Sequence, residues 1–257
     1  MAVSRIFVIA EAGVNHDGSL MKARELVDAA KYAKANAVKF QMFSSQKLWG
    51  DDRIKHLELC ESEILDLAAH CADAQIEFMC TPFGEEEVLF LNSLVTRHKI
   101  ASGCIGRRAI LDAVAHTGKP AILSTGMSTY DDIRNALKSL GDKRTTLLHC
   151  TSAYPCPLKE VNLRAMQAMG HFGCPVGYSD HTRGMMASLS AAAMGASVIE
   201  KHLTLDRRQP GPDHLASMEP RDFKRMIEKI REVETLLGER SKSVQPSEAA
   251  CHKAWRG

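Results

Sequence analysis

The chain has 257 residues, of which 45% are hydrophobic and 25% charged, and its formal net charge is +2. The length matches the roughly 250 residues of a single α/β barrel, and the composition is that of a globular protein with a full core. The small net charge argues against nucleic-acid and membrane partners. The first residues run directly into an apolar strand pattern, without room for a signal peptide, and no apolar run reaches the roughly 18 residues that span a bilayer. We therefore expect a cytoplasmic protein.

Apolar runs typical of buried strands alternate with amphipathic patterns typical of helices. The predicted strands cover residues 6–10, 37–42, 76–80, 98–101, 120–123, 145–150, 175–182 and 198–202. The predicted helices cover about 20–30, 61–74, 85–94, 107–117, a segment after the N-cap Thr129, 162–169, 184–195 and 220–237. In the second strand, Lys39 and Gln41 alternate with apolar residues and so point to the same side.

Eight strand–helix units in succession predict a closed parallel barrel, the (β/α)8 TIM barrel, over residues 1–238. Residues 239–257 then form a C-terminal tail or the remnant of a linker. The alternative fold, a doubly wound open sheet, would require a glycine-rich phosphate loop after the first strand. The spacing Gly13-x-x-x-x-Gly18 does not fit that pattern.

The eight cysteines are scattered along the chain, and no two form a Cys-x-x-Cys pair. Several lie within apolar runs. For a chain in a reducing compartment, this pattern predicts free thiols that fill core volume.

The carboxyl ends of the predicted strands are almost all polar. Because a closed barrel brings these ends onto one rim, where barrel enzymes carry their catalytic residues, we expect the side chains to converge. Lysine and hydroxyl side chains at these ends are Lys39, Thr81, Lys99, Ser102, Ser124, Ser152 and Ser179. Both kinds donate hydrogen bonds to phosphate oxygens, and lysines neutralise the phosphate charge. The rim therefore predicts a site for a phosphorylated anionic substrate.

The last two strands end in histidines, His181 and His202, beside Asp180 and Glu200. Two imidazoles on adjacent strand ends, with carboxylates to orient them, favour a divalent metal. With two nitrogen ligands, the remaining positions would take water or a substrate oxygen, as a Lewis acid that polarises a carbonyl requires.

Taken together, the strand ends resemble the catalytic barrel of the sialic acid (N-acetylneuraminate) synthase family, which condenses phosphoenolpyruvate with an N-acetylated amino sugar. Nine short motifs occur in the family's order between residues 6 and 217. They are the stretches 11–18, 39–41, 81–83, 99–103, 123–127, 149–155, 177–182, 200–202 and 211–214, among them Gly177-Tyr178-Ser179-Asp180-His181-Thr182 and Glu200-Lys201-His202.

The resemblance implies a role for each matching position. Those that would hold phosphoenolpyruvate are Lys39, Thr81, Lys99, Ser102, Ser124 and Ser179. His181 and His202 match the ligands of a divalent metal, Mn²⁺ or Mg²⁺, that also binds the aldehyde oxygen of the sugar. Glu11 matches the catalytic glutamate, and Asp180 and Glu200 are expected to orient the metal ligands. Residues expected near the acceptor sugar are Gln41, Tyr154 and Asp213, and Ser152 is a further substrate-binding candidate.

Several differences from the family lie on the acceptor side. Family members usually carry an antifreeze-like domain after the barrel, whereas this chain ends at Gly257, so a homodimer or a separate antifreeze-like protein is a candidate partner. The loop after the second strand, beginning with residues 43–49, is expected to be short. Cys104 and Ser152 replace an acidic residue and an asparagine found in other members.

The predicted function is thus a transferase that forms a carbon–carbon bond from phosphoenolpyruvate and yields a 3-deoxy-2-keto nonulosonic acid. Two alternatives remain open. One is a related deoxy-sugar-acid synthase with another aldehyde acceptor. The other is a non-catalytic barrel that binds a sugar or phosphoenolpyruvate and needs a partner domain.

Overall fold

The structure, a computed structural model, describes residues 5–239 and 241–256. Residues 1–4, the stretch before the first predicted strand, and residues 240 and 257, within the predicted tail, lie outside the described residues.

Eight parallel strands form one sheet in the order β3-β2-β1-β8-β7-β6-β5-β4. The two end strands, β3 and β4, lie beside each other, so the sheet nearly closes into the predicted barrel. The strands are β1 (Phe7–Gly13), β2 (Ala37–Met42), β3 (Glu77–Pro82), β4 (His98–Ile100), β5 (Ala121–Ser124), β6 (Thr145–His149), β7 (Val176–Asp180) and β8 (Val198–His202).

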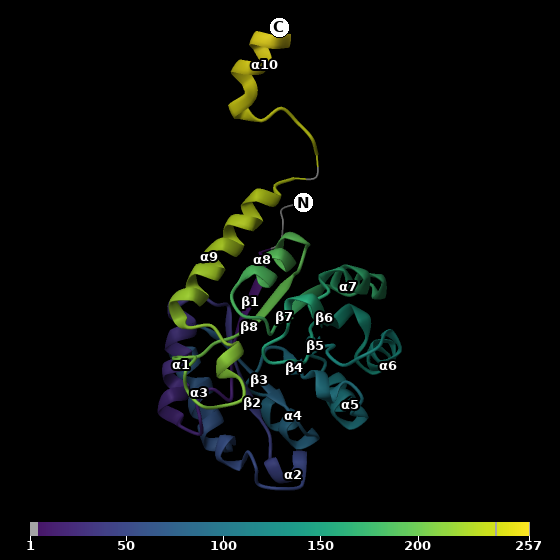
Figure 1. The fold of residues 1–257 in the computed structure, drawn as a ribbon. Helices are drawn as coiled ribbons and strands as arrows, with labels where there is room; N and C mark the ends of the chain where they lie inside the picture. The colour runs from purple at the N-terminus through teal and green to yellow at the C-terminus, as the bar shows by residue number, and fades with distance from the viewer. Residues whose placement is uncertain (1–4, 240, 257) are drawn as a thin grey trace.

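Helices connect successive strands and cover the outside of the barrel (Figure 1). They are α1 (Leu20–Tyr32), α2 (Ser45–Trp49), α3 (Glu61–Asp73), α4 (Glu85–Leu91), α5 (Arg108–His116), α6 (Tyr130–Leu140), α7 (Leu163–Ala168), α8 (Met186–Ala193), α9 (Pro220–Leu237) and α10 (Ala249–Arg256). The predicted elements are confirmed with small shifts at their ends. Thr129 caps α6 as expected, accepting a hydrogen bond from the backbone N–H of Asp132.

One expectation about the connections was wrong. The segment between β2 and α3 is not a short loop, because residues 43–60 form α2 and a 3₁₀ turn (Lys55–Leu57). The short spacing of its apolar residues gives no helical or strand period, so periodicity did not reveal it.

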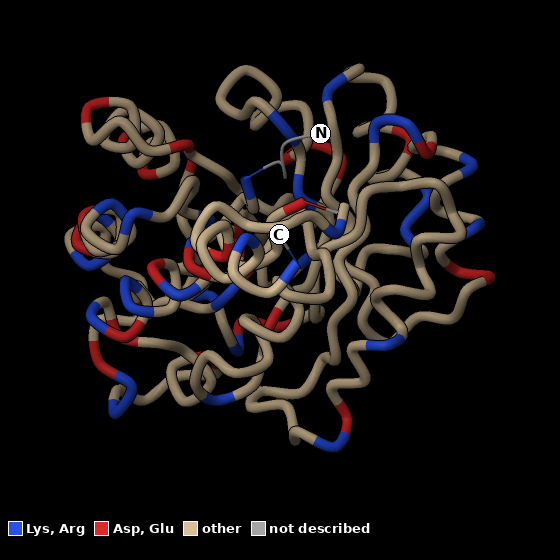
Figure 2. Tube along the Cα trace, turned by 90° about the horizontal axis from the view of Figure 1, so that it is seen from above, with Lys and Arg blue, Asp and Glu red and all other residues tan. Residues whose placement is uncertain are grey.

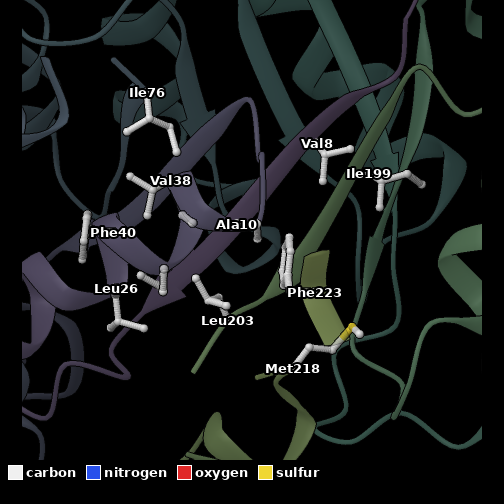
Figure 3. Packing of buried hydrophobic residues seen from close by; sticks show 14 of the residues in the cluster. Val8, Ala10, Leu26, Val38, Phe40, Ile76, Ile199, Leu203, Met218 and Phe223 are labelled. Atoms are coloured by element: carbon white, nitrogen blue, oxygen red, sulfur yellow. The ribbon is translucent and has the colours of Figure 1, made fainter. Parts of the chain in front are cut away.

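The strands carry two apolar faces. Inside the barrel, a small cluster fills the lower part of the interior and consists of Ile9, Ala37, Met79, Ile122, Leu148 and Val198. The alternate strand residues point outward and pack against the helices in a larger cluster, and Figure 3 shows some of its members, among them Val8, Ile199 and Phe223. Six of the eight cysteines are buried and all eight are free, as predicted.

The last part of the chain is exposed. Beyond Leu237, every described residue up to Arg256 is exposed, and α10 stands away from the barrel (Figure 1). Basic and acidic residues are interspersed along the chain trace (Figure 2). None of the described helices is long and apolar enough to cross a membrane.

Candidate active site

A cavity of about 540 Å³ opens at the carboxyl ends of the strands. This volume lies within the roughly 300–1,000 Å³ of small-molecule sites. The structure brings to its lining every residue predicted to be catalytic or to bind substrate or metal: Glu11, Lys39, Gln41, Thr81, Lys99, Ser102, Ser124, Ser152, Tyr154, Ser179, His181, His202 and Asp213.

The bottom of the cavity is a polar floor, which we define as Glu11, Lys39, Thr81, Lys99, Ser124, Ser179 and Glu200. Its position follows from the two-residue period of a strand. Glu11, Lys39, Thr81, Ser124 and Glu200 each stand two residues after a member of the apolar cluster inside the barrel. The same inward face of the strands is therefore apolar below and charged above.

Two buried lysines organise the floor. Lys39 Nζ lies 2.6 Å from Glu11 Oε2 and donates a hydrogen bond to Thr81 Oγ1 at 3.0 Å. Lys99 Nζ donates to Ser124 Oγ at 2.7 Å. Glu200 lies between them, 3.6 Å from each Nζ. The lysines are thus held by carboxylates, and their hydroxyl partners stand ready to donate to an anion.

The two carboxylates of the floor differ in their proton affinity. Burial raises the pKa of Glu11 to about 7, an effect that Lys39 opposes and Glu200 reinforces. Burial alone would also raise the pKa of Glu200, but Lys39 and Lys99 together bring it down to about 2. Glu200 is therefore a fixed anion, whereas Glu11 can exchange a proton near neutrality.

Ser102 and Ser152 meet at Gly126, in the loop after β5. The backbone N–H of Gly126 donates to Ser102 Oγ at 3.0 Å. A Cβ atom at position 126 would lie 2.3 Å from Ser152 Oγ and 3.1 Å from Cys150 Sγ. Only glycine leaves room for these side chains at the edge of the floor.

His181 and His202 both line the cavity, and their rings meet edge-on with centroids 5.5 Å apart. His181 Nδ1 lies 2.7 Å from the carbonyl oxygen of Thr151, which can only accept, so Nδ1 carries the proton and Nε2 a lone pair. Burial lowers the pKa of both imidazoles, and His181 lowers that of His202 further. Both rings are therefore neutral and able to ligate a cation.

The described residues contain no group of three or more His, Cys, Asp and Glu side chains in metal-binding proximity. Any metal on the two imidazoles would thus take its remaining ligands from water or substrate.

Asp180 and Glu200, expected to orient the histidines, make no direct contact with either imidazole. Glu200 belongs to the floor and accepts a hydrogen bond from Ser179 Oγ at 2.8 Å. Asp180 points out of the barrel toward Lys201. The carboxylate nearest an imidazole is instead Asp213, whose Oδ2 lies 3.6 Å from His202 Nδ1. Strand alternation directs Asp180 away from the cavity, so the sequence already argued against a direct contact between this carboxylate and an imidazole.

The predicted acceptor residues surround the imidazoles and Glu11. The ring of Tyr154 lies 4.1 Å from that of His181 and 5.6 Å from that of His202, measured between centroids. Gln41 Nε2 donates to Glu11 Oε1 at 3.1 Å. Burial raises the pKa of Asp213 to about 6.

Sequence reasoning missed the upper side of the cavity. This apolar wall consists of Val14, Phe43, Leu48, Trp49, Ile54, Leu57 and Phe83, from the loops after β1, β2 and β3. The rings of Phe43 and Phe83 meet edge to face with centroids 6.0 Å apart. Arg53, which also lines the cavity, is paired with Asp51.

Close backbone packing holds the wall in place. Gly18 has a φ of 75°, and a Cβ atom there would lie only 2.1 Å from the carbonyl oxygen of His56. Ser45 Oγ donates to the carbonyl oxygen of Asp51 at 2.7 Å. The segment 43–60 is therefore packed against the loop after β1, which carries the motif that begins with Glu11.

Comparison with known proteins places this arrangement in a family. The sequence between residues 26 and 242 matches the NeuB family. The N,N'-diacetyllegionaminic acid synthase of Legionella pneumophila is 43% identical over 271 residues, covering 94% of this chain and 76% of that protein. The human N-acetylneuraminate-9-phosphate synthase is 32% identical, covering 96% of this chain and 75% of that enzyme.

A solved structure agrees with the whole fold. The N-acetylneuraminic acid (sialic acid) synthetase of Leptospira borgpetersenii serovar Hardjo-bovis, crystallised in complex with citrate, has 34% sequence identity and a TM-score of 0.93. The match covers 98% of this chain and 93% of that one. On the family match and these relatives, the chain belongs to the NeuB family.

Proposed function

We propose that the chain condenses phosphoenolpyruvate with an N-acetylated amino-sugar aldehyde, in a metal-dependent reaction that yields a sialic-type nonulosonic acid and phosphate. The observation that carries this proposal is a single cavity in which a floor of lysines and hydroxyls adjoins two neutral imidazoles. The names of the relatives, synthases of legionaminic and neuraminic acids, support the same class of reaction.

The polar floor suits the donor. Phosphoenolpyruvate carries a phosphate and a carboxylate, and Lys39 and Lys99 offer one cation to each region of negative charge. Thr81, Ser124 and Ser179 add hydroxyl donors beside them. Because these groups are buried, their interactions with an anion are stronger than they would be in water.

His181 and His202 would hold the metal, Mn²⁺ or Mg²⁺. Their neutral state fits this role, as does the buried Nδ1 of His202, which has no hydrogen-bond partner among the described residues. When bound, the metal supplies a Lewis acid that polarises the acceptor's carbonyl. The ring of Tyr154 lies beside both imidazoles, tilted against His181 and edge-on to His202.

The bonds change as follows. The electrons of the C2=C3 double bond of phosphoenolpyruvate form the bond from C3 to the aldehyde carbon, and the aldehyde C=O bond becomes a hydroxyl by taking up a proton. Water adds at C2 with loss of one proton. Cleavage of the bond between C2 and the phosphate oxygen then releases phosphate, which takes the proton of the C2 hydroxyl and leaves a C2 ketone. Glu11, with a pKa of about 7, is placed to orient the added water, and its ionised form can take the proton of that water. Gln41 donates a hydrogen bond to Glu11 Oε1, the carboxylate oxygen that is not paired with Lys39, and so fixes the orientation of this carboxylate.

The apolar wall suits an acceptor that carries acyl groups. The wall offers aromatic and aliphatic surface, and the guanidinium of Arg53 is already paired with Asp51. N-acetyl methyl groups would lose contact with water there. We therefore propose an N-acetylated acceptor.

A direct assay tests the function. The protein is incubated with phosphoenolpyruvate, Mn²⁺ and one of several aldehydes: an N-acetylated hexosamine, a diacetamido hexose, a 6-phosphorylated N-acetylhexosamine and a small non-acetylated sugar. Phosphate should appear only when an acceptor is present, and most rapidly with an acetylated one. Release with the non-acetylated sugar alone would favour the related deoxy-sugar-acid reaction, and tight binding without release would favour a binding protein.

A further inference from the structure

A buried ion pair lies on the outer side of β7 and β8, behind the candidate metal ligands. Strand alternation directs Ser179 and Glu200 into the cavity and the next residues, Asp180 and Lys201, toward the helices. Asp180 Oδ2 lies 3.3 Å from Lys201 Nζ, and both side chains are completely buried. Neither residue lines the cavity, so the reaction proposed above does not use them.

Both side chains of this pair make further hydrogen bonds. Asp180 Oδ1 accepts from the backbone N–H and the hydroxyl of Thr182, both at 2.8 Å. Asp180 Oδ2 accepts from Ser188 Oγ of α8 at 2.6 Å, and Lys201 Nζ donates to the carbonyl oxygen of Thr182. The network therefore ties the chain on both sides of His181 to β8 and α8.

The position of the ion pair in the sheet places it directly before the two histidines. Asp180 and Lys201 are direct partners in the β7–β8 register, at its last paired position. The next residue along each strand is His181 or His202. The β7–β8 register ends at this position, and among the described residues the ion pair is the last side-chain link between the two strands before the two rings.

A contribution to folding alone explains the pair poorly. Two charges removed completely from water incur a desolvation cost that their attraction roughly balances, and apolar residues of similar size often stabilise a protein equally well. What an ionic, multiply hydrogen-bonded pair adds is a fixed geometry.

We infer that Asp180 and Lys201 are positioning residues that set the spacing of His181 and His202 for metal binding. The inference rests on the proposed function in one respect, that the two imidazoles hold the metal. Partners that orient metal ligands from outside the coordination sphere typically alter metal affinity about 10- to 100-fold when removed.

The test compares Lys201→Met, Asp180→Asn and the double variant with the unaltered protein. Calorimetry with Mn²⁺ alone, without substrates, should give an affinity that is lower by about 10- to 100-fold in each variant. Chemical denaturation should reveal a loss of stability in the single variants, which leave one charge unpaired, and recovery in the double variant. Binding of phosphoenolpyruvate without metal should persist in the double variant, because Lys39 and Lys99 are unchanged.

Arg231→Met serves as the control for lost stability. Arg231 pairs with Glu234 at 2.6 Å on α9, is partly buried and does not line the cavity. This variant should lose stability and keep its Mn²⁺ affinity.

Two results would overturn the inference, and they are distinguishable. If the double variant binds Mn²⁺ as tightly as the unaltered protein, the pair serves folding only and the proposed function stands. If the unaltered protein releases phosphate yet binds no Mn²⁺, the metal proposal fails and the positioning role fails with it.

Discussion

The polar floor and the apolar wall bind by different physics, although they share one cavity. The floor is deeply buried and charged, with Lys39 3% and Lys99 2% exposed. The wall reaches the surface, where Trp49 is 57% exposed, and it offers shape and apolar area rather than charge. A buried charged site tolerates little variation in its ligand, because each unmatched charge is costly. An apolar surface discriminates weakly between substituents of similar size. The chain should therefore be strict about its donor and more permissive about its acceptor.

A substitution at His202, where the floor and the wall meet, should have the largest effect on activity. Replacing His202 with alanine removes one of two proposed metal ligands without altering the floor or the wall. We expect metal-dependent phosphate release to be abolished, while phosphoenolpyruvate still binds in calorimetry. Full activity of the unaltered protein after treatment with a chelator would contradict the role assigned to this histidine.

A substitution in the polar floor should have the second-largest effect. Lys39→Met leaves the buried carboxylates of Glu11 and Glu200 without their shared cation. The loss of such a partner costs about 2–5 kcal/mol of binding free energy, which a calorimetric titration with phosphoenolpyruvate would measure. Lys143→Met, at an exposed lysine before β6, is the matched control. Equal donor affinity in the two variants would contradict the assignment of the floor.

The floor, unlike the wall, should respond to pH near neutrality. An anion bound beside Glu11 raises its pKa above the value of about 7, so binding favours the protonated carboxyl and takes up a proton. Relative to Glu11→Gln, the unaltered protein should lose phosphoenolpyruvate affinity as the pH rises above about 7, by at most about tenfold per unit. The ratio of the two affinities isolates Glu11 from the donor's own ionisation. A ratio that stays constant between pH 6 and 9 would count against this linkage.

The smallest effect should come from the wall. Trp49→Ala removes an aromatic surface that an acceptor would cover, and burial of a side chain of this kind contributes about 1.5–3 kcal/mol when complete. Because Trp49 is half exposed, we expect the acceptor KM to rise by about tenfold and the donor KM to stay the same. Trp255→Ala, in the exposed helix α10, provides a matched control. An equal rise in both KM values would contradict the assignment of the acceptor to the wall and the donor to the floor.

The fold and the floor could be predicted from the sequence for one physical reason. A parallel barrel imposes a two-residue period on each strand, and this period connects the apolar interior at Ile9 or Val198 with the polar residues Glu11 and Glu200 above. The apolar wall has no such period. Leu48, Trp49 and Ile54 lie in short irregular turns, and their packing depends on contacts with the distant loop around Gly18. The role of Glu200 required the distances to both lysines, which no pattern in one strand contains.

Other expectations from the sequence stay predictions: the choice between Mn²⁺ and Mg²⁺, the cytoplasmic location, the homodimer and the separate antifreeze-like partner. The division between a barrel over residues 1–238 and a tail over 239–257 is also a prediction, consistent with α9 ending at Leu237.

The difference in depth between floor and wall has a kinetic consequence. An acceptor seated against the wall would cover the route to Lys39 and Lys99, so a donor that arrives second would find its site closed. The substrates should therefore add in a compulsory order, phosphoenolpyruvate first. Excess acceptor should then inhibit the reaction competitively toward the donor, while excess donor should not.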